Sequence, residues 1–328
     1  MSNSLVENNI TSLTRYKKPK NFFSWQLFYK CNYHCNYCFE KNLTHYNFNY
    51  DELLKTSQNI WKYYKKFGFE WLSIIGGEAT LLEADKLLYL FKDFKNEKDI
   101  TFELITNFYR PIEYFEKIFL YFKNIKRIII KVSYHEEYNT LKNFFQKFEE
   151  LIKISKKYKN VFLKIEFVIT EQTSKMAIAY YEYFSFLKKK YSNIGLHLAE
   201  AFEYHKGWKL NYLFDSSKLV KYFPFLNKHL TQRRKYIVEK DNSFKIDYSV
   251  NFLKQKSKIL HTKGCLCFQS EVFLEDNKLK NFCDRNIICD DFMNCNINDL
   301  KVAKCKICEN EICSETFVKV INKDKNIC

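Results

Sequence analysis

The stretch Cys31-Asn32-Tyr33-His34-Cys35-Asn36-Tyr37-Cys38 decides how this chain is interpreted. Its three cysteines have the spacing CxxxCxxC, which suits three corners of one cubic iron–sulfur cluster. Thiolates are the soft ligands that hold such clusters. The fourth iron would then lack a cysteine ligand, and such an iron can bind a substrate or cofactor instead of only passing electrons. The loop therefore predicts a cluster that takes part in chemistry.

Zinc and disulfide bonds are the alternative uses of these cysteines. Structural zinc needs four ligands, and the nearby fourth would have to be His34 or His45. His34 lies between Cys31 and Cys35 and would strain the loop. We do not expect disulfides, because the first twenty residues are polar and contain no apolar signal-peptide core. We expect a metal or redox role in a reducing cytoplasm, with an iron–sulfur cluster favoured over zinc.

A second motif, Gly76-Gly77-Glu78, follows the apolar run 71–75. The chain has only six glycines, so an adjacent pair is unusual. Glycines at a strand end let the backbone turn and let a ligand approach closely. The carboxylate that follows can accept hydrogen bonds from an ammonium group. Gly-Gly-Glu alone is more often a turn, but its position after a strand and downstream of the cysteine loop favours a binding site.

Together the two motifs resemble those of the radical S-adenosylmethionine (SAM) superfamily. The resemblance implies that an electron from the reduced cluster cleaves SAM, and that the resulting 5′-deoxyadenosyl radical abstracts hydrogen from the substrate. It also implies a role for each motif residue: cluster ligation by Cys31, Cys35 and Cys38, contact with adenine by Tyr37, and binding of the SAM amino group by Gly76, Gly77 and Glu78. Ala79 stands where the family often has proline.

Residues 23–200 are expected to form six βα units. The patterning predicts strands at 23–28, 71–75, 102–106, 128–133, 161–170 and 194–198, and helices at 51–66, 81–94, 137–157 and 174–190, with a further helix beginning near Pro111. Such alternation implies an α/β fold with a parallel sheet and helices outside it. The resemblance implies a partial (β/α)6 TIM-like barrel.

Chemistry in a parallel barrel lies at the C-terminal ends of the strands. The cysteine loop and the glycine pair follow the first and second expected strands, and Asn107 and Ser133 end the third and fourth. The resemblance implies that Asn107 and Ser133 contact SAM. Phe108 stands where the family's TNG-like segment has glycine, which makes the local turn an open question.

Three further polar residues lie near strand ends. His135 is the catalytic candidate, because its near-neutral pKa suits proton transfer, although a structural hydrogen bond is an equal alternative. Glu200 and Glu203 could bind a cationic or hydroxyl-rich substrate, but solvated loop carboxylates are the simpler interpretation.

Nine of the twelve cysteines lie in the last 64 residues. Residues 271–274 and 279–282 are expected to form a hairpin. The cysteine arrangement resembles the SPASM or shorter twitch extension of radical SAM enzymes, which carries auxiliary [4Fe–4S] clusters. The resemblance implies at least one such cluster, with these candidate ligands: Cys265, Cys283, Cys305, Cys308 and, for a second cluster, Cys313 with Cys328. A zinc ribbon built from the same cysteines is the alternative.

Two departures from the SPASM pattern leave the number of auxiliary clusters open. Lys278 replaces the usual glycine, and Asn277 is expected to supply the left-handed residue instead. Phe317 stands where a further cysteine is expected.

The expected organisation has four parts: an N-terminal arm at 1–22, the barrel at 23–200, a connector with some helix at 201–261, and the SPASM- or twitch-like domain at 262–328. The chain of 328 residues is 46% hydrophobic, enough for a substantial core. No apolar run approaches the roughly 20 residues that span a bilayer. The net charge is +16, but the lysines are dispersed, which disfavours nucleic-acid binding.

The sequence thus predicts a SAM-dependent radical enzyme of the oxidoreductase or maturase type, reduced by a donor such as flavodoxin or ferredoxin. Modification of a peptide or protein is the favoured reaction class. No winged-helix peptide-binding module is recognisable before the barrel, so dehydrogenation or epimerisation of a small molecule such as an aminosugar is the first alternative. A zinc or iron–sulfur protein without catalysis is the second.

Overall fold

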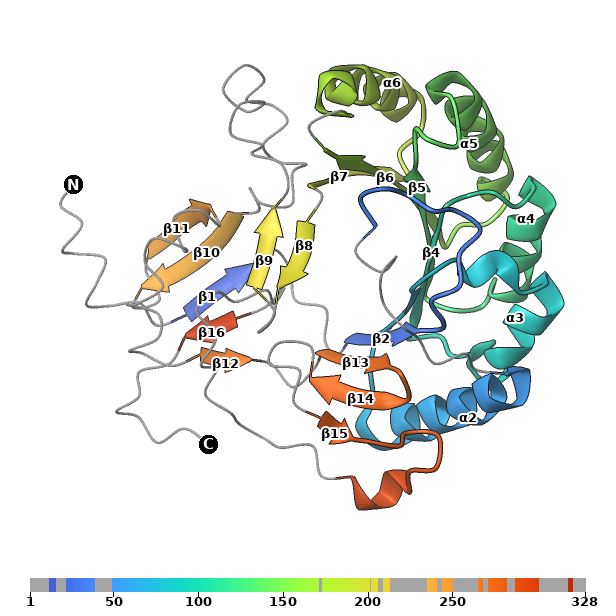
Figure 1. Ribbon diagram of the computed structural model, residues 1–328, viewed down its shortest axis with the longest axis vertical. Helices are drawn as coiled ribbons and strands as arrows, with labels where there is room; N and C mark the ends of the chain where they lie inside the picture. The colour runs from blue at the N-terminus through green and yellow to red at the C-terminus, as the bar shows by residue number, and fades with distance from the viewer. Residues whose placement is uncertain are drawn as a thin grey trace.

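A nine-stranded sheet with helices along its outer side forms the frame of the protein (Figure 1). This computed structural model describes residues 12–15, 22–38, 49–170, 173–200, 202–205, 209–212, 235–240, 244–249, 265–267, 271–281, 287–300 and 318–320. The strand order in the sheet is β15-β14-β13-β2-β3-β4-β5-β6-β7. Figure 1 shows the helices arranged in an arc around the six strands from β2 to β7.

The six central strands run parallel to their neighbours. Their bounds are β2 Phe22–Gln26, β3 Trp71–Ile75, β4 Thr101–Thr106, β5 Arg127–Tyr134, β6 Val161–Ile169 and β7 Ile194–Glu200. The α-helices between them are α2 Tyr50–Phe67, α3 Ala84–Leu90, α4 Ile112–Tyr121, α5 Leu141–Ser155 and α6 Ala177–Lys190. The prediction of a parallel α/β sheet with outer helices is therefore confirmed.

The predicted helices differ from the structure in their bounds, most strongly in two cases. The helix expected at 81–94 is broken into the 3-10 turn η1 Ala79–Leu81, α3, and the 3-10 turn η2 Lys92–Phe94, because Leu82 and Glu83 have extended backbones. The helix expected from 137 begins only at Leu141, where the Thr140 side chain caps it by accepting a hydrogen bond from Asn143 N.

Strand alternation separates two faces of the sheet. On β6, Leu163, Ile165 and Phe167 are fully buried in the core with the helices. Lys164 and Glu166 alternate with them and so lie on the inner face, opposite to the helices. The inner face of an otherwise apolar strand therefore carries charge.

The C-terminal hairpin extends the parallel sheet. Strand β13, Glu271–Glu275, pairs in parallel with β2 and is followed by β14, Lys278–Asn281, and β15, Ile287–Cys289. Asp276 and Asn277 have φ angles of 48° and 60°, so the predicted left-handed Asn277 is confirmed. Positive φ at both turn residues matches the twist of the two strands.

A second sheet joins segments from both ends of the chain and from the expected connector. Its order is β11-β10-β1-β16-β12, with β1 Ser12–Arg15, β10 Lys235–Lys240, β11 Phe244–Ser249, β12 Cys265–Cys267 and β16 Val318–Val320. A separate pair is formed by β8 Phe202–His205 and β9 Lys209–Tyr212. The described parts of the expected connector, 202–205, 209–212, 235–240 and 244–249, are strands, and the predicted helix in it lies outside the described residues.

The segment after β15 is attached to α2 by hydrogen bonds to its backbone carbonyls. Asn59 Nδ2 donates to the carbonyls of Phe292, Met293 and Cys295 at 2.8, 3.0 and 3.4 Å. Lys66 Nζ donates to three more within 3.1 Å, those of Ile297, Asn298 and Leu300 in and next to the 3-10 turn η6 Ile297–Asp299. Two side chains thus orient this segment without secondary-structure pairing.

No helix within the described ranges is long and apolar enough to cross a bilayer.

Substitution of Asn59 by alanine should loosen this C-terminal segment from α2. The loss of the buried amide group would leave three carbonyls with weaker or no partners, at a cost of about 1–3 kcal/mol in unfolding free energy. Hydrogen exchange at 292–300 should accelerate. Gln58→Ala, one residue away on the exposed side of the same helix, should change stability by less than about 0.5 kcal/mol. Equal exchange in the two variants would contradict the attachment.

Candidate iron–sulfur and cofactor site

The loop with the three cysteines leaves β2 at its C-terminal end. Leu27 N still donates to Ile75 O of β3 at 3.0 Å, and a turn closes between Cys38 N and Cys35 O at 3.0 Å. Cys35 is 5% exposed, whereas Cys31 and Cys38 are partly exposed. All three are thiols outside any disulfide bond. The predicted ligands are therefore brought together on one short loop at the predicted edge of the sheet.

Burial and neighbouring charges raise the pKa values of two of the three thiols. Burial raises the pKa of Cys35 to about 12; the hydrogen bond from Tyr37 opposes this shift, and the charges of Glu137, Cys38 and Cys31 add to it. Burial also raises the pKa of Cys31, and Cys38 contributes to that shift. Without a metal these two thiols remain protonated, and metal binding would displace their protons.

The donor set fits an iron–sulfur cluster. Among the described residues, no group of three His, Cys, Asp or Glu side chains could hold a single metal ion. Each cysteine of a cubic cluster binds a different iron, so its three thiols need not converge on one point. Three thiols on one loop of eight residues, Cys31 to Cys38, are compatible with this requirement.

The glycine pair contacts the chain's own backbone. A Cβ atom on Gly77 would lie 2.3 Å from Lys30 O and 2.6 Å from the carbonyl carbon of Tyr29, and one on Gly76 would lie 2.9 Å from Phe28 O. Both glycines have positive φ angles, 86° for Gly76 and 35° for Gly77. Close approach of a ligand was one sequence-based explanation for these glycines. In the structure, the backbone that leads into the cysteine loop occupies this space.

Glu78 ties the end of β3 to the end of β4. Its carboxylate is fully buried and accepts four hydrogen bonds: from Thr80 N at 3.1 Å, Thr80 Oγ1 at 2.5 Å, Thr106 Oγ1 at 2.8 Å and Asn107 N at 2.5 Å. Burial raises its pKa, against the lowering effect of these bonds. Within the described residues Glu78 forms no ion pair, and its four described partners are all neutral donors.

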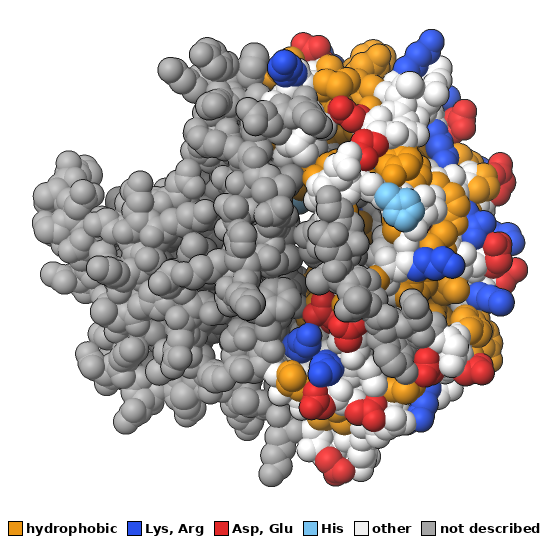
Figure 2. Space-filling model, viewed as in Figure 1, with side chains coloured by type: hydrophobic (Ala, Val, Ile, Leu, Met, Phe, Trp, Pro, Cys, Tyr) orange, Lys and Arg blue, Asp and Glu red, His pale blue; other side chains and the backbone are white. Residues whose placement is uncertain are grey.

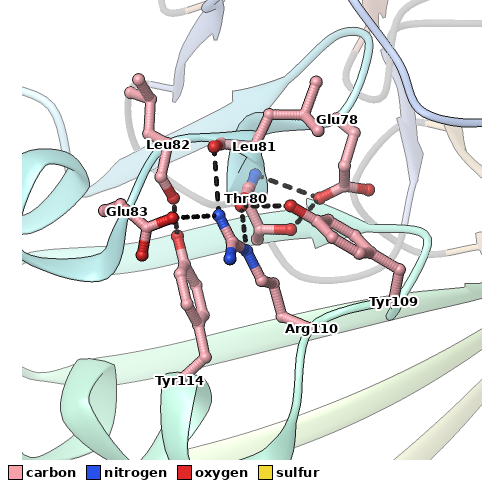
Figure 3. A network of polar contacts seen from close by, with 8 residues as sticks. All are labelled: Glu78, Thr80, Leu81, Leu82, Glu83, Tyr109, Arg110 and Tyr114. Carbon is pink, nitrogen blue, oxygen red and sulfur yellow. Dashed lines mark hydrogen bonds and ion pairs between the residues drawn. The ribbon is translucent and has the colours of Figure 1, made fainter.

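Arg110 fixes the loop after Glu78 from the other side (Figure 3). Its Nε donates to Thr80 O at 2.7 Å, and its Nη2 donates to Leu81 O at 3.1 Å and Glu83 Oε1 at 2.9 Å. Tyr109 OH also donates to Thr80 O, at 3.0 Å, and Tyr114 OH donates to Leu82 O, at 3.0 Å. Arg110 was not among the residues predicted from the sequence, because two of its three partners are backbone carbonyls, which leave no pattern in a sequence.

Asn107 lies beside the cysteine loop, and Phe108 makes the turn that places it there. Asn107 Nδ2 is 2.8 Å from Asn32 Oδ1 and 3.7 Å from Cys31 Sγ. Phe108 has a φ of 64°, although it is not glycine. Its ring is 2% exposed, its N–H donates to Thr106 Oγ1 at 3.0 Å, and its carbonyl accepts from Lys147 Nζ at 2.6 Å. Burial and these bonds offset the backbone strain.

The segment after β5 holds the cysteine loop by polar and aromatic contacts. His135 Nδ1 lies 3.3 Å from Cys35 Sγ and 2.7 Å from Tyr37 OH. Tyr138 OH accepts from His34 N at 2.5 Å, and its ring stacks on Tyr33 with centroids 3.9 Å apart. The His135 side chain therefore contacts a predicted cluster ligand directly. Burial lowers its pKa to about 4.

Ser133 belongs to a charged group on the inner face that the sequence analysis missed. Ser133 Oγ is 3.5 Å from Glu166 Oε1, and Glu166 also contacts Lys131 Nζ and His197 Nδ1, the latter at 2.5 Å. Burial opposes ionisation of Glu166, but the Lys131 ammonium and the His197 hydrogen bond outweigh it and hold its pKa below the usual range. The alternation of 161–169 was the available signal, because it puts Glu166 on the face opposite to the helices.

The remaining candidate residues lie partly outside the described residues. Cys265 begins β12, and Cys283, Cys305, Cys308, Cys313 and Cys328 fall outside the described ranges. Glu200 ends β7 and Glu203 lies in β8. Two cysteines outside the predicted ligand set, Cys289 and Cys295, lie in hydrogen-bond contact with each other.

Comparison with protein families finds a match over the first half of the chain. Residues 23–150 match the family model described as a 4Fe-4S single cluster domain. The matched range contains the cysteine loop, the glycine pair, Asn107 and His135. No curated protein matches the sequence.

Several solved structures are similar at low identity. A structure of polyhistidine-tagged anSMEcpe with bound AdoMet has a TM-score of 0.48 and 18% identity, over 87% of this chain and 81% of that one. Streptococcus suis SuiB bound to S-adenosylmethionine has a TM-score of 0.46 and 17% identity, over 84% of this chain and 62% of SuiB. BtrN in complex with AdoMet and 2-DOIA has a TM-score of 0.32 and 15% identity, over 45% and 58%.

Gly77→Ala should prevent the cysteine loop from holding iron, because its Cβ would collide with the backbone of Tyr29 and Lys30. Gly68→Ala is the matched control: Gly68 also has a positive φ, 70°, but a Cβ there meets nothing within 4 Å. Both variants should lose about 1–3 kcal/mol from backbone strain. Iron per chain after anaerobic reconstitution should fall in Gly77→Ala to the value of the Cys31→Ala/Cys35→Ala/Cys38→Ala variant. Equal iron in the two glycine variants would contradict the packing argument.

Proposed function

We propose that the protein is a radical SAM enzyme whose N-terminal [4Fe–4S] cluster is bound by Cys31, Cys35 and Cys38. The observation that carries this proposal is the position of the CxxxCxxC loop at the C-terminal end of β2, packed on Gly76 and Gly77, within the segment that matches a 4Fe-4S domain. When bound, the cluster supplies the electron that cleaves SAM to methionine and the 5′-deoxyadenosyl radical.

The chain's own residues orient the cofactor in this proposal. We assign contact with SAM to Asn107, which faces the cysteine loop, and to Ser133, which lies on the adjacent strand β5. Glu78 is a buried carboxylate without a cationic partner among the described side chains. Its negative charge is complementary to the positive ammonium group of SAM. Its four hydrogen bonds also make it the residue that positions Asn107.

The inner face of the sheet favours a polar substrate. Glu103 pairs with Lys164 at 3.2 Å and accepts from Trp71 Nε1 at 3.1 Å and Ser73 Oγ at 3.0 Å. Glu166 pairs with Lys131 one strand away. Charged and hydrogen-bonding groups on this face support a peptide or protein substrate, our preferred class, and equally admit an aminosugar-like molecule.

Surface charge and cysteine chemistry bear on the partners and the cellular location that we propose. Figure 2 shows acidic and basic side chains interspersed on the coloured part of the face in view, with no large patch of one sign, which disfavours nucleic acid there. We place the protein in a reducing cytoplasm, where thiols stay available as cluster ligands and a donor such as flavodoxin or ferredoxin would reduce the cluster. We assign the C-terminal cysteines to at least one auxiliary cluster in a SPASM- or twitch-like domain.

SAM cleavage tests this function directly. Anaerobically reconstituted protein with dithionite and SAM should release 5′-deoxyadenosine and methionine, and the Cys31→Ala/Cys35→Ala/Cys38→Ala variant should release neither. Iron that persists in this variant would support the auxiliary cluster. Bound zinc and no 5′-deoxyadenosine from the wild type would favour the non-catalytic alternative and contradict the proposal.

A further inference from the structure

Cys35, Tyr37 and His135 form a triangle of polar contacts at the buried side of the cysteine loop. His135 Nδ1 lies 3.3 Å from Cys35 Sγ and 2.7 Å from Tyr37 OH. The Tyr37 hydroxyl also hydrogen-bonds the Cys35 thiol. The Tyr37 and His135 rings are parallel within 8°, with centroids 6.1 Å apart. This environment surrounds Cys35, the most buried of the three predicted ligands.

The triangle is held from several sides. Tyr33 meets the His135 ring edge-on, with centroids 5.6 Å apart, and stacks on Tyr138. Glu137 Oε1 accepts from Asn36 N at 3.2 Å, on the residue between Cys35 and Tyr37. The segment that carries His135 is therefore attached to the cysteine loop at positions before and after Cys35. The contact with the sulfur is therefore part of an interface between two loops that several other contacts hold together.

Once Cys35 is a metal ligand, Tyr37 and His135 must be the donors in these contacts. A metal-bound thiolate has no proton, so it can only accept. The Tyr37 hydroxyl then donates to Cys35 Sγ, and His135 Nδ1–H can donate to the Tyr37 oxygen or to the sulfur. Hydrogen bonds to ligand sulfurs are among the factors that set the reduction potential of an iron–sulfur cluster. They stabilise the more negative, reduced form.

We propose that Tyr37 and His135 act as hydrogen-bond donors to the Cys35 ligand sulfur and raise the reduction potential of the N-terminal cluster. This inference rests on the proposed function only in requiring a cluster at the loop. It differs from the expected roles of these residues, contact with adenine for Tyr37 and proton transfer for His135. His135 is then a positioning residue for the electron-transfer step.

The test is an EPR-monitored redox titration of the anaerobically reconstituted full chain. The N-terminal signal is the one that the Cys31→Ala/Cys35→Ala/Cys38→Ala variant lacks. Tyr37→Phe keeps the ring but removes the donor, and His135→Phe removes the second donor. At the wild-type midpoint potential, we expect the reduced-to-oxidised ratio to fall about tenfold in each, which corresponds to about 59 mV for a one-electron couple.

Two further variants separate tuning from general damage. His135→Asn retains a side-chain N–H near the Nδ1 position and should keep the ratio within about threefold of wild type. Tyr64→Phe loses a hydroxyl that donates to Glu97 Oε2 outside the site instead of to a sulfur, and its potential should not move. A SAM-induced change of the EPR signal that persists in Tyr37→Phe would show that the altered potential does not come from a lost SAM site.

The outcomes distinguish this inference from the proposed function. A wild-type signal whose potential is the same in Tyr37→Phe and His135→Phe would overturn the inference and leave the cluster assignment intact. Absence of the N-terminal signal from the wild type itself would overturn the proposed function and this inference with it. An equal shift in Tyr64→Phe would also overturn the inference, because the effect would then not come from the sulfur contact.

Discussion

The structure of the site depends on one close backbone contact, the packing of Gly76 and Gly77 against the carbonyls of Phe28, Tyr29 and Lys30. No side chain fits in this space, and Glu78 N donates to Lys30 O at 2.9 Å directly beside it. The residues that carry the cysteine loop away from β2 are therefore fixed by β3. The position of all three thiols relative to the sheet follows from that contact.

Three loops at the same edge of the sheet are joined around this contact. Glu78 binds the end of β4 through Thr106 and Asn107, and Arg110 binds back from β4 to the loop after β3. The segment after β5 holds the cysteine loop through His135 and Tyr138. The parallel strands bring these loops together, and neutral donors and carbonyls make most of the connections. Among the described residues, this arrangement joins the loops without an ion pair to the buried Glu78.

The sequence indicated the strands and the cysteine loop well, because apolar runs and cysteine spacing are local signals. Strand 71–75 was predicted with its observed bounds, and Asn277 was correctly expected to be left-handed. The packing of the glycine pair against the chain's own backbone could not be predicted from such local signals, because the short distance between Lys30 and Gly77 depends on strand pairing. The same is true of His135, whose contact with Cys35 joins residues 100 positions apart.

Other differences have equally physical causes. Phe108 departs from the glycine expected at a positive φ, and the burial of its ring together with Lys147 offsets the strain. The pairing of Glu166 with Lys131 and His197 crosses three strands, so alternation predicts the face but not the partners. The attachment of the C-terminal hairpin to β2 also requires the assembled sheet.

The central claim is that the open iron of a cluster at Cys31, Cys35 and Cys38 binds SAM. The most direct measurement is the EPR spectrum of the dithionite-reduced full chain before and after addition of SAM. We predict a change in the signal that is absent from the Cys31→Ala/Cys35→Ala/Cys38→Ala variant. A spectrum from this loop that SAM leaves unchanged would contradict the account.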